Sequence, residues 1–339
     1  MSQRFALTLI GLSFGLIVSV APARVEAKDL DITLTRHGEL LKLAFREVVA
    51  DAAHLAIEAE INEAVKAPGT LVDSRRGICV VKASSLGEFA SRSDAFRCRL
   101  SGNRWQPARF LHYEKSQDLV YLRCEMPEDW SSPPIEYLRD MKPGQWVVSL
   151  RYADELPLGV GVLGALPRKI ASSSGYVGLT VDQADGGLTV KEVFANSGAS
   201  RAGLKSGDII LDDENEPVTK RRRLSQVLAE LEPGDWFLLS ALRDGEPVTF
   251  DIRVGTSWNM LVDRQEMMNR FGSDVSARRS GFRSALQHDT LLHPDECGGP
   301  LVSLDGKLIG ANIARAGRTD TLTVPIEDIL STIEEISLD

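Results

Sequence analysis

Beyond residue 27 the sequence has no apolar run long enough to span a bilayer, no low-complexity tract and no excess of basic residues. These absences predict an ordered, soluble mature chain. The formal net charge of −9 argues against a nucleic-acid partner. Hydrophobic residues make up 43% of the chain, which is enough for two or three ordinary domains.

Cysteine is scarce, with only Cys79, Cys98, Cys124 and Cys297 in the chain. Four thiols allow three complete disulfide pairings, and the sequence does not choose among them. Three of the four lie between positions 79 and 124, whereas Cys297 is far away. The simplest prediction is one disulfide among the first three, with Cys297 free.

The first 27 residues, MSQRFALTLIGLSFGLIVSVAPARVEA, have the pattern of a signal peptide. Arg4 precedes an apolar stretch that ends at Ala21. Small residues at Ala21 and Ala23, or at Val25 and Ala27, mark two candidate cleavage sites. We therefore expect an exported protein, periplasmic or secreted, in which disulfides are permitted. The alternative is an uncleaved N-terminal anchor.

Periodicity predicts a mainly β protein with a few helices. Apolar residues recur at three- and four-residue spacing over residues 35–50, which predicts an amphipathic helix. Short segments rich in Val, Ile, Leu and aromatic residues follow, separated by turn residues, which is typical of a barrel or sandwich. Residues 175–254 have a different pattern, in which glycine-marked turns flank the helical stretch RRRLSQVLAELEPGD. This pattern predicts a separate small domain. A last helix is predicted at PIEDILSTIEEI.

The most informative stretch is HPDECGGPLVSLDGKLIGANIA, from His293 to Ala314. A Gly-Gly-Pro-Leu run after a nucleophilic side chain is how trypsin-like serine proteases present their serine. With GTLVDSRRGICVVKASSL and QDLVYLRC upstream, this stretch resembles the HtrA/Deg family of trypsin-fold proteases with PDZ domains. The resemblance covers most of the mature chain. It implies a trypsin-like double β-barrel.

The middle segment resembles a PDZ domain, most specifically in ANSGASRAGLKSGDIILDDENEPV. Such a domain offers backbone N–H groups to a chain-terminal carboxylate, while the peptide adds as a strand. The resemblance implies two sets of peptide-binding residues. The carboxylate loop would hold Tyr176, Val177, Gly178 and Leu179, and the helix would contribute Leu224, Val227 and Leu228. The alternative is a PDZ fold used only as a spacer or docking surface.

The order of the segments departs from the family, because the PDZ module interrupts the second barrel instead of following it. The expected divisions are a signal peptide (1–27), N-terminal helix and first barrel (28–150), start of the second barrel (151–174), PDZ domain (175–254), linker (255–283), and remainder of the second barrel with the C-terminal helix (284–339). Tethering at both ends restricts rotation of the module. The family's assemblies therefore do not transfer directly, and an oligomer is left open.

Matching the family motifs position by position implies a degenerate catalytic triad. Asp118 stands at the aspartate position, but Ser84 replaces the histidine and Cys297 replaces the serine. Asp295 stands where the family has the glycine whose N–H helps form the oxyanion hole. A serine hydroxyl cannot act as a base near neutral pH. Because a free thiol has a pKa of about 8.5 and Asp295 and Glu296 disfavour its ionisation, activation of Cys297 is opposed.

Two histidines lie near the nucleophile position in sequence. His288 and His293 precede Cys297, but neither matches a family catalytic position, and a base normally arrives from the opposite barrel. Their spacing to Cys297 is weak evidence for zinc, so no metal or other cofactor is predicted. We expect each to be a surface or hydrogen-bonded histidine. The basic run at residues 220–223 is interpreted as a solvated helix face.

The leading hypothesis is an exported HtrA-like pseudoprotease that binds peptides or misfolded chains, through their C-termini, in envelope quality control. The competing hypothesis is an active endopeptidase that uses Cys297 with Asp118 and an unrecognised base. A third is a structural or signalling partner of a true protease, whose C-terminus the PDZ domain binds.

Overall fold

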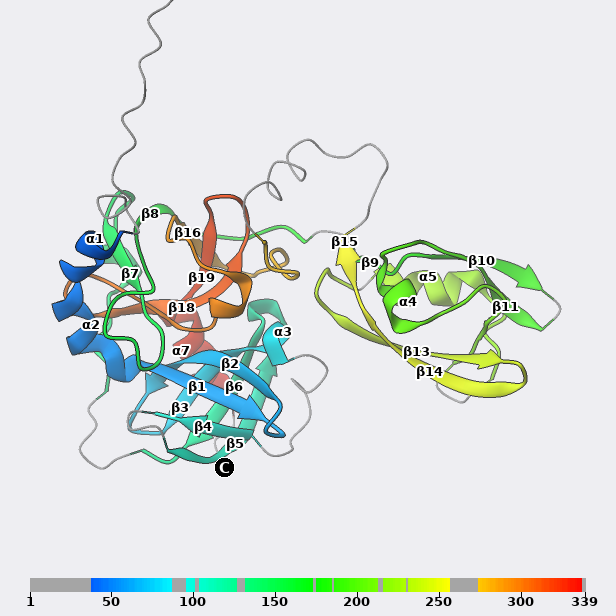
Figure 1. The fold of residues 1–339 in the computed structure, drawn as a ribbon, viewed down its shortest axis with the longest axis horizontal. Helices are drawn as coiled ribbons and strands as arrows, with labels where there is room; N and C mark the ends of the chain where they lie inside the picture. Colours follow the sequence, from blue (N-terminus) through cyan, green and yellow to red (C-terminus); the bar gives the residue numbers. More distant parts are fainter. Residues whose placement is uncertain are drawn as a thin grey trace, which may run out of the picture.

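The computed structural model describes residues 38–86, 96–100, 104–126, 132–172, 175–184, 186–212, 216–229, 231–256 and 274–336. The signal-peptide prediction therefore lies outside the described residues. Within them the chain forms two closed β-barrels, side by side, and a separate β module to one side (Figure 1). The mainly β, double-barrel fold predicted from the sequence is confirmed.

The first barrel is a closed antiparallel sheet of six strands in the order β1-β2-β3-β6-β5-β4. Its strands are β1 (Ala56–Ile61), β2 (Val65–Asp73), β3 (Ile78–Lys82), β4 (Phe96–Arg99), β5 (Trp105–Glu114) and β6 (Leu119–Cys124). They follow the short apolar segments seen in the sequence, and every residue of β3 is buried. The predicted disulfide is confirmed as Cys98–Cys124, while Cys79 and Cys297 are free and buried.

The second barrel has the order β16-β19-β18-β17-β7-β8. Its strands are β7 (Trp146–Ser149), β8 (Gly159–Arg168), β16 (Ala285–His288), β17 (Pro300–Val302), β18 (Leu308–Arg315) and β19 (Thr321–Pro325). β8 and β16 are antiparallel neighbours, although the β module lies between them in sequence. The module is therefore inserted where a hairpin loop would join two adjacent strands.

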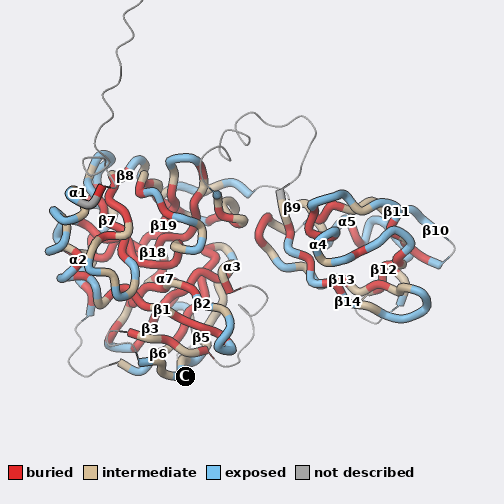
Figure 2. The backbone as a smooth tube through the Cα atoms, viewed as in Figure 1, coloured by how far each residue is buried: buried red, intermediate tan, exposed pale blue. Residues whose placement is uncertain are grey.

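One apolar core joins the two barrels with the terminal helices. It contains Val80 and Tyr121 of the first barrel, Val148 and Ile313 of the second, and Ile329 of α7 (Ile326–Glu335), the predicted C-terminal helix. Figure 2 shows this buried interior continuing from one barrel into the other. Because the core is shared, the barrels are held in a fixed relation to each other.

The predicted N-terminal helix is broken. The structure has α1 (Glu39–Leu43), α2 (Arg46–Ala52) and the 3₁₀ turn η2 (Ala53–Leu55) instead of one helix over residues 35–50. The N–H groups of Ala44 and Phe45 bond three residues back, which tightens the chain at this point, and the Phe45 ring lies against Trp146. Leu40, predicted on the apolar face, is 55% exposed.

The inserted module has its own core and a five-stranded sheet in the order β10-β11-β12-β13-β14. Its elements are β10 (Leu179–Ala184), β11 (Gly187–Val193), α4 (Gly198–Ala202), β12 (Ile209–Ile210), α5 (Arg221–Ala229), β13 (Trp236–Arg243) and β14 (Glu246–Arg253). At its base β9 (Gly175–Tyr176) pairs with β15 (Gly255–Thr256), which brings its two ends together. None of the described helices has the length and hydropathy of a bilayer-spanning segment.

Candidate functional site

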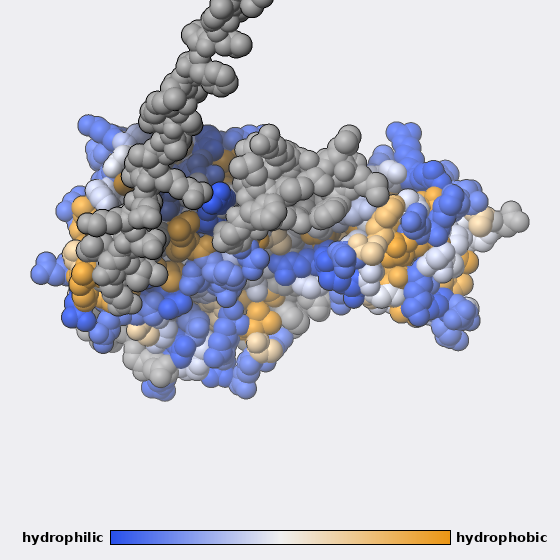
Figure 3. Space-filling view, turned by 45° about the horizontal axis from the view of Figure 1, so that its top comes forward, coloured by the Kyte–Doolittle hydropathy of each residue, from blue (hydrophilic) through white to orange (hydrophobic). Residues whose placement is uncertain are grey.

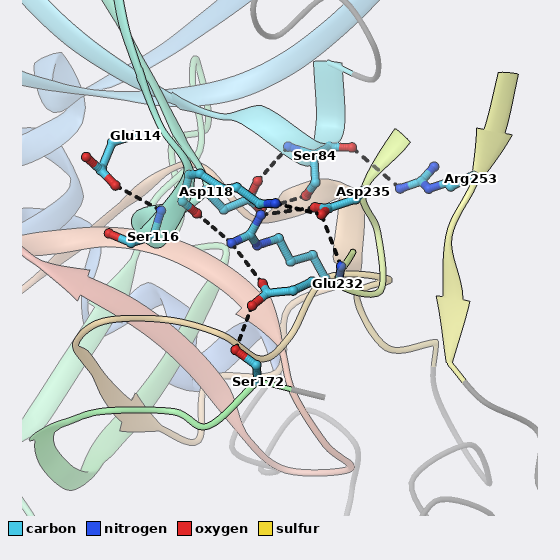
Figure 4. Close-up of polar contacts among 10 residues, drawn as sticks. Ser84, Glu114, Ser116, Asp118, Ser172, Glu232, Asp235 and Arg253 are labelled. Carbon is cyan, nitrogen blue, oxygen red and sulfur yellow. Dashed lines mark hydrogen bonds and ion pairs between the residues drawn. The ribbon is translucent and has the colours of Figure 1, made fainter. Parts of the chain in front are cut away.

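Ser84 and Asp118 meet directly, although 34 positions separate them. Ser84 lies in the short helix α3 (Ala83–Leu86) after β3, and Asp118 ends the 3₁₀ turn η4 (Lys115–Gln117) before β6, the strand beside β3. The backbone N–H and the hydroxyl of Ser84 donate to the two carboxylate oxygens of Asp118, at 2.9 and 2.7 Å. Figure 4 shows this pair. Two triad positions are therefore assembled, with a hydroxyl where a base is required.

Asp118 is held in a restricted setting. It is 1% exposed, and its φ of 57° places its backbone in the left-handed region, which Asp tolerates better than most residues. Burial raises the pKa of Asp118 above its ordinary value, against the opposing influence of Arg278, Lys82 and the hydrogen bonds from Ser84. Its carboxylate accepts hydrogen bonds from a serine and so has no imidazole to orient.

Cys297 lies at the end of the 3₁₀ turn η6 (Pro294–Glu296) and is fully buried. Its thiol lies 3.7 Å from the His293 carbonyl oxygen. The loop is tied to the first barrel, because the Thr70 hydroxyl donates to the Gly298 carbonyl at 2.8 Å. The nucleophile position is therefore formed but carries a side chain with no exposure to solvent.

The surroundings of Cys297 favour the neutral thiol. Burial is the main cause and raises the pKa of Cys297 above its ordinary value. The positive charge of Lys82 and a hydrogen bond from Ser276 act in the opposite direction, and Glu296 adds to the rise. At neutral pH the thiolate needed for attack is therefore scarce.

Lys82 is a site residue that the sequence interpretation missed. Its side chain is 3% exposed, and its Nζ donates to the Ser276 hydroxyl at 3.2 Å, beside Cys297. The available signal was a lysine at the end of an otherwise apolar strand, since Lys is rarely buried without a reason.

The histidines do not supply the missing base. His288 is buried, and its ring bonds Thr290 through Nδ1 and Asn312 and Thr323 through Nε2. Burial lowers the pKa of His288 to about 3, so it is neutral. The His293 ring is half-exposed and pairs with Asp295, which raises the pKa of His293. Both histidines are hydrogen-bonded, as expected, and within the described part of the chain the hydrogen-bond partners of their rings do not include the Cys297 thiol.

The carboxylates next to Cys297 are engaged by other partners. Asp295 is exposed and bonds the His293 ring. The Glu296 carboxylate accepts a hydrogen bond from the His293 N–H at 2.7 Å and another from Arg151. Over the described residues, three or more His, Cys, Asp or Glu side chains never gather as a metal site would require.

Residues 274–283, the described end of the predicted linker, pack among the barrels and the module. The Ser276 N–H donates to the Arg315 carbonyl, the last residue of β18, at 2.9 Å. Arg278 is 2% exposed, donates to the Lys115 carbonyl and pairs with Glu232 and Asp235 of the module at 3.2 and 3.3 Å. These residues were predicted only as a connection, so their position at the site is a second feature that the sequence interpretation missed.

The module docks on the triad positions through a few polar contacts (Figure 4). Arg253 donates to the Ser84 carbonyl at 3.5 Å, and Asp235 pairs with Lys115 at 3.1 Å. Glu232 also accepts a hydrogen bond from Ser172, in the connection from β8 to the module, at 2.6 Å. The module is therefore held against the first barrel, the connection from β8 and residues 274–283 by charge pairs and hydrogen bonds.

The four predicted carboxylate-loop residues form the turn from β9 to β10. Gly178 has φ +88°, and a Cβ there would collide with the Ser197 side chain, so glycine is required. Its carbonyl accepts hydrogen bonds from the Phe194 N–H and the Ser197 hydroxyl. Val177 is buried, the Tyr176 ring lies against Phe194, and Leu179 begins the edge strand β10.

The predicted helix residues lie in α5, which packs on the same core as β10. Leu224 is buried and Leu228 half-buried, but Val227 is 44% exposed and does not share their buried face. Arg221, the first residue of α5, donates to the Val181 carbonyl of β10 at 2.6 Å. Figure 3 shows further apolar patches on the module, where Phe194, Trp236 and Leu238 are each more than a third exposed.

Comparisons with known proteins agree with this geometry. A family model described as "PDZ domain" matches residues 175–254. The chain is 28% identical over 153 residues to the periplasmic pH-dependent serine endoprotease DegQ of Escherichia coli (strain K12), a match that covers 44% of this chain and 30% of that protein. It is 30% identical over 91 residues to the periplasmic serine endoprotease DegP of the same strain, covering 26% and 19%.

A third relative is the serine endoprotease DegS of Salmonella typhimurium, 30% identical over 94 residues, covering 28% of this chain and 26% of that protein. The chain thus spans less than a third of the length of these curated relatives. A solved structure, a serine endoprotease from Yersinia pestis, matches at 17% identity with a TM-score of 0.30, covering 63% of this chain and 98% of that one.

Proposed function

We propose that this HtrA-like trypsin-fold protein with a PDZ domain is a pseudoprotease that binds peptides or misfolded chains in envelope quality control. The observation that carries the proposal is the Ser84–Asp118 pair, which occupies the place of the base and its orienting carboxylate. Acyl transfer by this fold needs a base that takes the nucleophile's proton, and losing a triad member costs roughly a thousandfold or more in rate.

The rest of the site supports binding over catalysis. Cys297 is buried and protonated, and the residues around it contribute no imidazole. The module, by contrast, keeps the carboxylate loop and an edge strand with a helix beside it. An extended peptide would add to β10 and place its terminal carboxylate at the loop. The names of the relatives DegQ and DegP place those proteins in the periplasm, which supports export of this chain to the same compartment.

One observation favours a second candidate, a cysteine endopeptidase. Lys82 is buried beside Ser276 and its charge favours the Cys297 thiolate. An ammonium group beside a thiol stabilises the thiolate, which is the attacking form. In this candidate Lys82 would serve Cys297, and Asp118 would remain paired with Ser84.

Casein should remain uncut by the purified mature protein in reducing buffer, to the same extent as by Cys297→Ala. The reason is that the site lacks both a thiolate and a histidine base. Circular dichroism establishes that both proteins are folded, and a trypsin-fold endoprotease serves as positive control. Cleavage by the unaltered protein but not by Cys297→Ala would refute the pseudoprotease proposal, and Lys82→Met would then test the second candidate.

A further prediction concerns the edge strand. Arg221 occupies the Val181 carbonyl that an added peptide strand would need. We expect Arg221→Ala to tighten binding of an uncharged C-terminal peptide by roughly three- to tenfold, because one competing hydrogen bond of about 1 kcal/mol is removed. Fluorescence anisotropy of a labelled peptide measures the change. Arg222→Ala, which removes the adjacent exposed charge, is the control; equal tightening in both variants would show a general charge effect instead.

A further inference from the structure

The last residue of β18 holds Ser276, in the segment 274–279, through both its backbone N–H and its carbonyl. The Arg315 carbonyl accepts the Ser276 N–H, and the Arg315 N–H donates to the Ser276 hydroxyl, both at 2.9 Å. The N–H of Asn312, three residues earlier in β18, donates to the Gly299 carbonyl at 2.9 Å, so this end of the strand lies beside the loop that carries Cys297. Backbone pairing with a strand is a recurrent mode of peptide recognition.

Ser276 also covers the nucleophile. Its hydroxyl accepts hydrogen bonds from the Lys82 Nζ at 3.2 Å and from the Arg315 N–H at 2.9 Å. The same hydroxyl lies close enough to Cys297 to lower the pKa of its thiol. Ser276 is 1% exposed and Cys297 is fully buried. A substrate peptide that reached the thiol would therefore have to displace Ser276 and break these contacts.

Arg278 anchors the segment to the module. Its guanidinium is nearly fully buried between Glu232 and Asp235. The backbone also fits closely, since a Cβ on Gly234 would lie 2.6 Å from the Arg278 Cβ, and a Cβ on Gly281 would collide with the Glu232 carboxylate. Removing one partner from a buried ion pair leaves a charge without compensation, which is strongly unfavourable. Arg278 therefore stays buried only while the turn at residues 232–235 remains docked.

We infer that residues 274–279 are an internal ligand of the site around Cys297, held in place by the docked PDZ module. The segment occupies the position of an extended peptide, and displacement of the module releases it. This inference rests on the proposed function and extends it. In addition to lacking a base, the site is then physically blocked to substrate. It also makes the position of the module and access to Cys297 interdependent.

The rate at which a thiol reagent modifies Cys297 tests this inference. In a Cys79→Ser background Cys297 is the one thiol outside the Cys98–Cys124 disulfide. Arg278→Gln removes the anchor, and Glu232→Gln with Asp235→Asn removes its partners from the module side. Each change is expected to raise the labelling rate with iodoacetamide by about tenfold or more, through a larger population of the open segment.

Arg243→Gln is the matched control. It breaks the Arg243–Asp208 pair, at 2.6 Å, inside the module and away from the segment. Its labelling rate should stay that of the parent. Unchanged labelling in a folded interface variant would overturn the inference, as would an equal rise in the control, which would indicate general loosening of the module. Casein cleavage by the parent would refute the proposed function without altering these labelling rates.

Discussion

Replacing Gly298 by alanine is expected to lower the free energy of unfolding by about 3–5 kcal/mol. Gly298 has φ +128°, a conformation that side-chain-bearing residues rarely adopt. A Cβ there would also collide with the Pro68 carbonyl of β2, in the other barrel. Because the Thr70 hydroxyl binds the Gly298 carbonyl, the loop cannot move away without losing that contact as well. Urea unfolding of the purified variant measures the loss.

Gly144→Ala separates the two causes. Gly144 precedes β7, the first strand of the second barrel, and also has a positive φ, +89°. A Cβ there would have no neighbour within 4 Å. The free energy of unfolding of Gly144→Ala should therefore fall only by the cost of a positive φ at a non-glycine residue, about 1 kcal/mol. Equal losses in the two variants would mean that the close approach of Gly298 to Pro68 contributes nothing.

The Gly298 prediction bears on what the Gly-Gly-Pro-Leu motif specifies. The Gly-Gly pair after Cys297 is required by packing, since a Cβ on Gly299 would lie 2.5 Å from the Leu150 carbonyl oxygen and collide with it. This requirement holds whether or not the preceding residue attacks a substrate. The motif therefore predicts the fold of the loop much better than it predicts catalysis.

The assembly of the triad positions was predictable from sequence because it follows from strand register. Ser84 comes directly after β3 and Asp118 directly before β6, and these strands are neighbours in the barrel. Motif matching selected both residues from the sequence, and the structure brings them into contact. The same holds for the carboxylate loop, whose conformation depends on Gly178 and the adjoining strand.

The contacts of residues 274–283 were not predictable in this way. Ser276 meets Lys82 across 194 positions, and Arg278 meets Lys115 across 163. Polar and basic residues between two domains are typical of a solvated linker. The sequence periodicity of such a segment does not distinguish a buried arginine from an exposed one. The break at Ala44 and Phe45 has a similar origin, because a tertiary contact with Trp146 overrides the helical pattern.

Acidification from pH 6.5 to 4.5 is expected to cost about 2–3 kcal/mol of folding free energy through His288 alone. Burial lowers the pKa of His288 to about 3 in the folded chain, against about 6.5 when unfolded. Between these values the unfolded chain binds the additional proton, so stability is present above pH 6.5 and falls as pH falls. Urea unfolding at several pH values measures this slope.

His288→Gln and His293→Gln together test the assignment. The first variant removes the group and should flatten the slope between pH 6.5 and 4.5, although losing the bonds to Thr290 and Thr323 lowers its stability at neutral pH. The second removes a half-exposed histidine whose pKa is raised by Asp295, so its contribution is lost as pH rises, in the opposite direction. Asp118, with its raised pKa, is common to all three proteins and cancels in the comparison. An unchanged slope in His288→Gln would mean that acid sensitivity arises elsewhere, because glutamine does not titrate between pH 6.5 and 4.5.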